Sequence, residues 1–134
     1  NYENMRMVSQ RIRKAAKDLG VKRIIFGECG HAWRVAYSFL NTLAGPWEFL
    51  DPNYPVPQHI LDFTWKEIEK GYLKFDKSQN DHMTLTYHDS CNVARASRIG
   101  DYAGSQFEIP RNVIKAVCNN FVDMDQDTIH ENTL

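Results

Sequence analysis

Four chemically reactive side chains stand together in the chain, at His88, Asp89, Ser90 and Cys91. A thiolate at the end of a strand suits a soft metal or an iron–sulfur cluster, which makes Cys91 the leading candidate ligand. The neighbouring residue types also suit acid–base or nucleophilic catalysis. However, consecutive residues of an extended segment point to opposite sides and no independent base accompanies them, so a catalytic triad is not predicted. We expect His88 and Asp89 to hold the loop through hydrogen bonds, and we assign no catalytic residue.

Three further residues belong to the candidate site or border on it. Arg95 could stabilise a negatively charged cluster or substrate, or equally form a surface salt bridge. Cys29, in the sequence E-C-G-H-A, is either a second ligand beside Cys91 or an ordinary buried thiol. Cys118 lies on the apolar side of a predicted helix, and we expect it to pack in the core as a small hydrophobic residue.

A zinc site is the alternative metal centre. Cys29, His31, His88 and Cys91 together make a Cys2His2 ligand set, although their spacing is not that of a compact zinc finger. Ligands at the ends of adjacent strands could meet, so this alternative stays open beside an iron–sulfur ligand role for Cys91 and Cys29.

Apolar periodicity predicts the elements that position these residues. Helices are predicted at Glu3–Leu19, Ala32–Leu43, Ile60–Lys70 and Pro110–Cys118, the last with Pro110 in its first turn. Short strands are predicted at Arg23–Gly27, Val56–His59, Met83–Tyr87 and Phe121–Met124. Their alternation predicts an α/β fold with a Rossmann-like parallel sheet and flanking helices. Cys29 and Cys91 should both lie at the C-terminal edge of the sheet, where such folds bind ligands.

Composition limits the possible functions. The 134 residues suit a single α/β domain, 1–134, and a net charge of -1 gives no electrostatic case for binding nucleic acid. No apolar run approaches the roughly 20 residues that span a bilayer, so we expect no direct membrane insertion. Three widely spaced cysteines indicate a reducing compartment rather than a disulfide framework. The start at Asn1 and the end at Leu134 suggest a segment of a larger protein.

The stretch from Tyr87 to Arg111 resembles the cysteine-rich CCG domain of heterodisulfide reductase subunits. It carries Y-H-D-x-C-x-x-x-R, a loop with Gly100 and Gly104, and E-x-P-R at a helix start. The order of the elements before this stretch also resembles that family, so the likeness covers most of the chain. The amino-acid sequence of this stretch is most similar to that of the K subunits of Dsr electron-transfer complexes in dissimilatory sulfur metabolism.

The resemblance implies a fragment of a two-half CCG domain within an iron–sulfur oxidoreductase subunit. In that family the position of Cys91 ligates a noncubane [4Fe-4S] cluster, with Arg95 and His88 nearby. Relatives commonly have C-x-x-C where this chain has Cys29 and Ala32, which removes one thiolate. The implied partners are membrane-associated electron-transfer subunits and a small sulfur-carrier protein or disulfide substrate. The implied location is cytoplasmic, peripheral to the inner membrane through those subunits.

Two other functions remain open. The chain could be a non-catalytic α/β binding module in which Cys91 is structural, or part of a related CCG subunit of lactate or glycerol oxidation. Because a cluster held by thiolates needs about four of them, we expect the isolated fragment to fold without a cluster and to lack disulfide-reductase activity.

Overall fold

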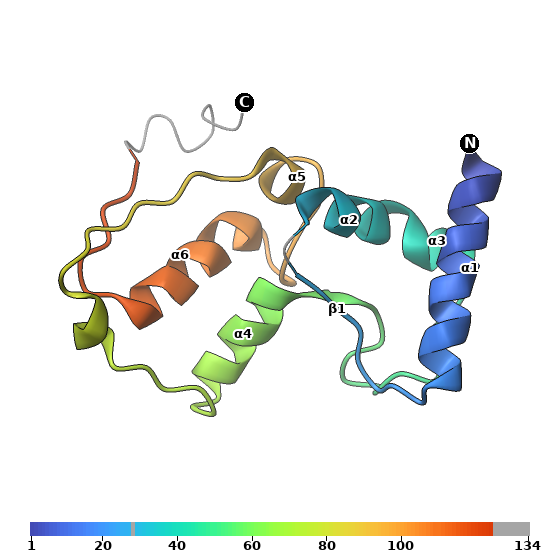
Figure 1. Ribbon diagram of the computed structural model, residues 1–134, viewed down its shortest axis with the longest axis horizontal. Helices are drawn as coiled ribbons and strands as arrows, with labels where there is room; N and C mark the ends of the chain where they lie inside the picture. Colours follow the sequence, from blue (N-terminus) through green and yellow to red (C-terminus); the bar gives the residue numbers. More distant parts are fainter. Residues whose placement is uncertain (28, 125–134) are drawn as a thin grey trace. The chain divides into compact units, whose positions relative to one another are not determined.

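The computed structural model describes residues 1–27 and 29–124. The chain divides into two compact units, Asn1–His59 and Ile60–Leu134. The first contains α1 (Tyr2–Asp18), β1 (Ile25–Phe26), α2 (Gly30–Val35), the π-helical turn η1 (Ala36–Leu40), α3 (Asn41–Ala44) and β2 (Gln58–His59). The second contains α4 (Ile60–Glu69), the 3-10 turn η2 (Lys77–Asn80), α5 (Cys91–Ala94) and α6 (Ser105–Val117), as labelled in part in Figure 1.

Helix α1 confirms the helix predicted at Glu3–Leu19. The side chain of Asn1 accepts a hydrogen bond from the backbone N–H of Glu3 at 3.1 Å, which caps the first turn. Glu3 in the first turn and Lys17 in the last both complement the helix dipole. The helix packs against α3 and η1 and buries Ser9 and Ala16.

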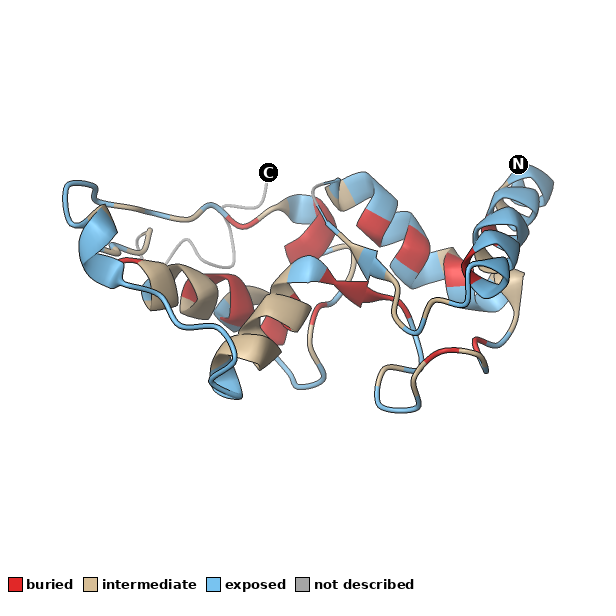
Figure 2. Ribbon diagram, turned by 60° about the horizontal axis from the view of Figure 1, so that its bottom comes forward, coloured by how far each residue is buried: buried red, intermediate tan, exposed pale blue. Residues whose placement is uncertain are grey.

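The two strands of the first unit pair in parallel, with Ile25 opposite Gln58 and Phe26 opposite His59. Figure 2 shows β2 buried in red, whereas β1 carries the exposed side chain of Ile25. Helices combined with parallel strand pairing confirm the predicted α/β class. Both strands are shorter than the runs predicted at Arg23–Gly27 and Val56–His59, and the Rossmann-like sheet stays a prediction.

The second predicted helix of the first unit is one continuous run of α2, η1 and α3. Cys29 is its N-cap residue, and the Sγ atom accepts a hydrogen bond from the N–H of Ala32 at 3.4 Å. Trp33 and Leu40 from this run enter the core. Gly45 ends the run at a φ of 88°, a backbone conformation that glycine adopts without steric cost.

The second unit pairs α4 with α6, which lie side by side in Figure 1. Strands predicted at Met83–Tyr87 and Phe121–Met124 reduce to one parallel bridge between Leu85 and Phe121. The N–H of Leu85 donates to the Asn120 carbonyl at 2.8 Å, and the N–H of Val122 donates to the Leu85 carbonyl at 2.9 Å. The two full strands were therefore a wrong prediction, because pairing between these runs is confined to this bridge, although its direction is parallel as expected.

Helix α6 begins at Ser105 and not at Pro110, which corrects the predicted helix start. The buried Oγ of Ser105 donates to the carbonyl oxygens of Ile99 at 2.5 Å and Tyr102 at 2.6 Å, which anchors the loop before the helix to its first residue. Pro110 lies inside the helix and is buried. Its missing N–H leaves the carbonyl of Gln106 without the usual i→i−4 donor, a cost that the packing of this helix overrides.

Candidate functional site

The best-defined polar cluster in the second unit is a buried ion pair between Asp89 and Arg111. The guanidinium donates from Nη1 to Asp89 Oδ1 at 2.8 Å and from Nη2 to Asp89 Oδ2 at 2.7 Å. Asp89 is 5% exposed and Arg111 is 7% exposed. This bidentate geometry is among the strongest arrangements of protein hydrogen bonds, so it fixes the backbone at Asp89 relative to α6.

Arg111 also binds two further groups. Its Nε donates to Asp123 Oδ2 at 2.7 Å, and Nη1 donates to the carbonyl of Phe107 at 2.8 Å. Hydrogen bonding to Asp89 raises the pKa of Arg111 further above its ordinary value, and hydrogen bonding to Asp123 also raises it. Arg111 therefore ties the segment before Cys91 and the segment after Phe121 to the same helix.

Cys91 begins α5 immediately after this anchor. Its thiol is free and the residue is exposed. The carbonyl of Ser90 accepts hydrogen bonds from Val93 at 3.1 Å and Ala94 at 2.7 Å, and both of these residues are buried. We name residues 87–95 the cysteine turn: one side is anchored in the unit, and the thiol remains accessible.

The predicted residues of the cysteine turn differ in burial and in the contacts that they make. Asp89 holds the loop through hydrogen bonds, as predicted. His88 and Arg95 are both exposed. Their roles beside a cluster stay predictions. The partner that sequence reasoning missed is Arg111, whose only signal was its place in E-I-P-R.

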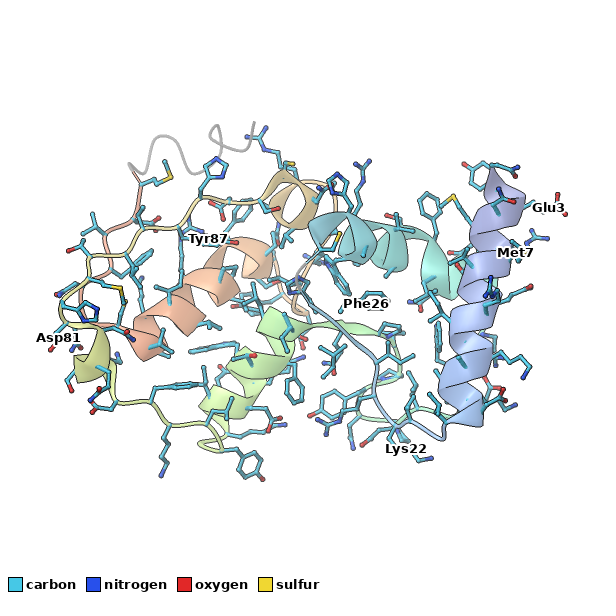
Figure 3. The ribbon with its side chains drawn as sticks, viewed as in Figure 1. Glu3, Met7, Lys22, Phe26, Asp81 and Tyr87 are labelled. Carbon is cyan, nitrogen blue, oxygen red and sulfur yellow. The ribbon has the colours of Figure 1, made fainter. Side chains whose placement is uncertain are left out.

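Tyr87 lies beside the same ion pair. The guanidinium of Arg111 is 5.5 Å from the centre of the Tyr87 ring. Figure 3 shows Tyr87 beside α6. Burial raises the pKa of Tyr87, the charge of Asp89 raises it further, and Arg111 lowers it. The neutral phenol is therefore favoured by the folded state.

This pKa shift predicts a pH dependence of stability. A phenol whose pKa is raised on folding stabilises the fold below its unfolded pKa of about 10, and this contribution is lost as the pH rises through the folded-state pKa. We expect Tyr87→Phe to lose less stability than the wild-type chain between about pH 9 and about pH 11, measured by urea unfolding. Tyr72→Phe is the control, because Tyr72 is 76% exposed. An equal loss in the wild-type chain and Tyr87→Phe would contradict the assignment.

The other two cysteines differ sharply in accessibility. Cys29 is exposed, so the interpretation as an ordinary buried thiol was wrong, and it lies in the first unit. Cys118 is 2% exposed and free, which confirms its predicted place in the core. Two exposed thiols remain as possible ligands for a soft metal.

A complete metal site does not assemble from the described residues. Across 1–27 and 29–124, no group of three or more His, Cys, Asp or Glu side chains is placed to hold a metal ion. Of the alternative zinc ligands, Cys29 and His31 belong to one unit and His88 and Cys91 to the other, so that set stays a prediction. Because a thiolate-held cluster needs about four ligands, the two exposed cysteines fit it only as part of a donor set.

The fold and the site define a mixed α/β chain that presents exposed cysteine thiols, one of them on a turn held by a buried ion pair. Two proteins similar to it are named iron–sulfur subunits. The chain is 35% identical, over 99% of its length, to the Hdr-like menaquinol oxidoreductase iron-sulfur subunit of Archaeoglobus profundus. It is 36% identical, over the same share, to the Hdr-like menaquinol oxidoreductase iron-sulfur subunit 2 of Archaeoglobus fulgidus. These similarities support a heterodisulfide-reductase-like (Hdr-like) family.

A more distant relative is the EtfAB:quinone oxidoreductase of Syntrophomonas wolfei, 28% identical over 93% of this chain. The chain spans 27% of the length of each Archaeoglobus protein and 15% of the third relative. No protein-family profile matches the chain, and no solved structure matches it. Within the described ranges, none of the helices has the length and apolar character needed to cross a membrane.

Proposed function

We propose that this chain is a segment of an Hdr-like iron–sulfur electron-transfer subunit, in which Cys91 supplies one ligand of the cluster. The observation that carries the proposal is the similarity of nearly the whole chain to two Hdr-like iron–sulfur subunits. The exposed thiol of Cys91 on an anchored turn supports it, because a ligand must be both accessible and held in place.

The residues of the chain would act mainly by positioning. The bidentate pair of Asp89 and Arg111 holds the cysteine turn, and the exposed Arg95 would lend positive charge near a negatively charged cluster. When bound, an iron–sulfur cluster supplies the one-electron chemistry that these side chains lack. We propose a noncubane [4Fe-4S] cluster, to which Cys29 would contribute a second thiolate.

For the parent protein, we propose that electrons pass between membrane-associated partner subunits and a disulfide or a small sulfur-carrier protein. This would place the subunit in dissimilatory sulfur metabolism, similar to the K subunit of Dsr complexes, on the cytoplasmic side of the membrane. A second candidate is quinol-linked electron transfer without a sulfur substrate. It is favoured by the names of all three relatives, which describe quinone or menaquinol oxidoreductases.

The ligand assignment is tested in the full-length parent protein. We expect Cys91→Ala to lower the iron and sulfide content strongly and to change the electron paramagnetic resonance signal of the cluster. Cys118→Ala is the matched control, since it removes a thiol that lies in the core. It should keep the cluster content while costing on the order of 1 kcal/mol of stability through the small cavity that it leaves.

Two outcomes would contradict the assignment. Equal loss of cluster from Cys91→Ala and Cys118→Ala would show that the effect is one of folding. Unchanged cluster content in Cys91→Ala would support the non-catalytic binding module instead. To separate the two electron-transfer candidates, the purified parent complex is supplied with a menaquinol analogue, and disulfide reduction is measured alongside quinol oxidation.

A further inference from the structure

A second feature of the Ile60–Leu134 unit lies outside the cysteine turn. It is a hollow of about 480 Å³ formed by α4, the segment that follows it and the C-terminal half of α6. Its apolar lining includes Trp65, Ile68 and Phe75. Three lysines also line it: Lys74, Lys77 and Lys115. Its volume is within the range of pockets that hold small organic ligands.

The charge around this hollow is one-sided. Among the described residues that line it there is no carboxylate. Two acidic side chains close to it in the sequence have partners of their own. Asp76 accepts hydrogen bonds from the backbone of Ser78 at 3.1 Å and from its hydroxyl at 2.6 Å, and Glu67 pairs with Lys70 at 3.2 Å. Three lysines thus line the hollow, and none of its described lining residues is a carboxylate.

The lysines also come from separate places in the fold. Lys74 lies in the segment after α4, Lys77 begins η2, and Lys115 lies near the end of α6 with its Nζ 5.4 Å from the centre of the Phe121 ring. Three lysines that come from different segments and line one hollow suit a multiply charged group such as a phosphate, for which lysine acts as a point charge. The indole and the phenyl ring offer flat faces for stacking.

We propose that this hollow binds a flat aromatic compound carrying a phosphate, the class that includes flavin mononucleotide and the adenine nucleotides. The ring system would pack against Trp65 and Phe75, and the phosphate would lie among the lysines. This site is independent of the proposed cluster ligand, because it shares no residue with the cysteine turn.

The experiment measures binding of flavin mononucleotide to the 134-residue chain by calorimetry and by quenching of flavin fluorescence. Riboflavin and inorganic phosphate are the matched probes, since each lacks one half of the recognised chemistry. We expect flavin mononucleotide to bind at least tenfold more tightly than either. Adenosine monophosphate in place of the flavin tests whether the site accepts the wider class.

A triple variant that replaces all three lysines by glutamine tests the role of their charge. This variant, Lys74→Gln with Lys77→Gln and Lys115→Gln, should weaken flavin mononucleotide binding at least tenfold and remove most of the salt dependence of binding. The control is Lys14→Gln, Lys17→Gln, Lys22→Gln, which removes the same charge from the first unit and should leave binding unchanged. Phe75→Ala should weaken flavin mononucleotide binding but not phosphate binding. Unfolding midpoints confirm that each variant folds.

Three results would overturn the proposal: no binding of either nucleotide at millimolar concentration, equal weakening by the two lysine variants, or inorganic phosphate binding as tightly as flavin mononucleotide. None of these depends on whether the parent protein carries an iron–sulfur cluster.

Discussion

Replacing Arg111 by methionine is expected to lower the free energy of unfolding by about 3–5 kcal/mol, the range found when one partner of a buried ion pair is removed. The cost is large because Asp89 is only 5% exposed and would keep a buried charge without its bidentate partner. Asp123 would lose its bond to the same guanidinium. Urea unfolding of the wild-type chain and the variant measures the difference.

The control for this substitution is Arg98→Met, which removes an exposed arginine from the same unit and should change stability by about 0.5 kcal/mol or less. A double variant, Asp89→Leu with Arg111→Met, replaces both charges by apolar groups and should recover much of the lost stability. If Arg111→Met and Arg98→Met lower the free energy of unfolding by the same amount, the ion pair does not anchor the cysteine turn.

Replacing Gly100 by alanine should cost about 2–4 kcal/mol for two separate reasons. Its φ of 76° disfavours any side chain, which accounts for about 1 kcal/mol. A Cβ atom there would also lie 2.7 Å from Ile109 Cδ1 and 2.8 Å from Ser105 Cβ, and such overpacking adds about 1–3 kcal/mol. Both neighbours are fully buried, so neither has room to move away.

Gly71→Ala is the matched control for this prediction. Gly71 has the same φ of 76°, but a Cβ atom there would meet nothing within 4 Å. Its cost should therefore be limited to the backbone strain of about 1 kcal/mol. The difference between the two variants, measured by thermal or urea unfolding, isolates the clash with α6, and equal costs would mean that the loop at Gly100 can shift away from Ser105 and Ile109.

Local patterns determined the parts of the fold that depend on neighbouring residues. The helices predicted at Glu3–Leu19 and Ile60–Lys70 correspond to α1 and α4 within a residue or two at each end. Helical periodicity and the glycines that follow both helices are read within a few turns of chain, so the sequence alone was sufficient. The burial of Cys118 was also predicted correctly, from the apolar face of the helix expected at Pro110–Cys118, although α6 itself ends at Val117.

Only the tertiary structure decided where the strands end, where α6 begins and what holds the cysteine turn. Strand length depends on a partner that lies far away in the chain, and Leu85 finds its partner only at Phe121. The start of α6 depends on the hydroxyl of Ser105 reaching the Ile99 carbonyl, a contact that overrides the local preference of Pro110 for a first turn. The sequence by itself identified Cys91 and Asp89 as one motif, but it could not pair Asp89 with Arg111. Such a pairing of charges is set by how α6 packs against the turn, because no sequence spacing encodes a long-range contact.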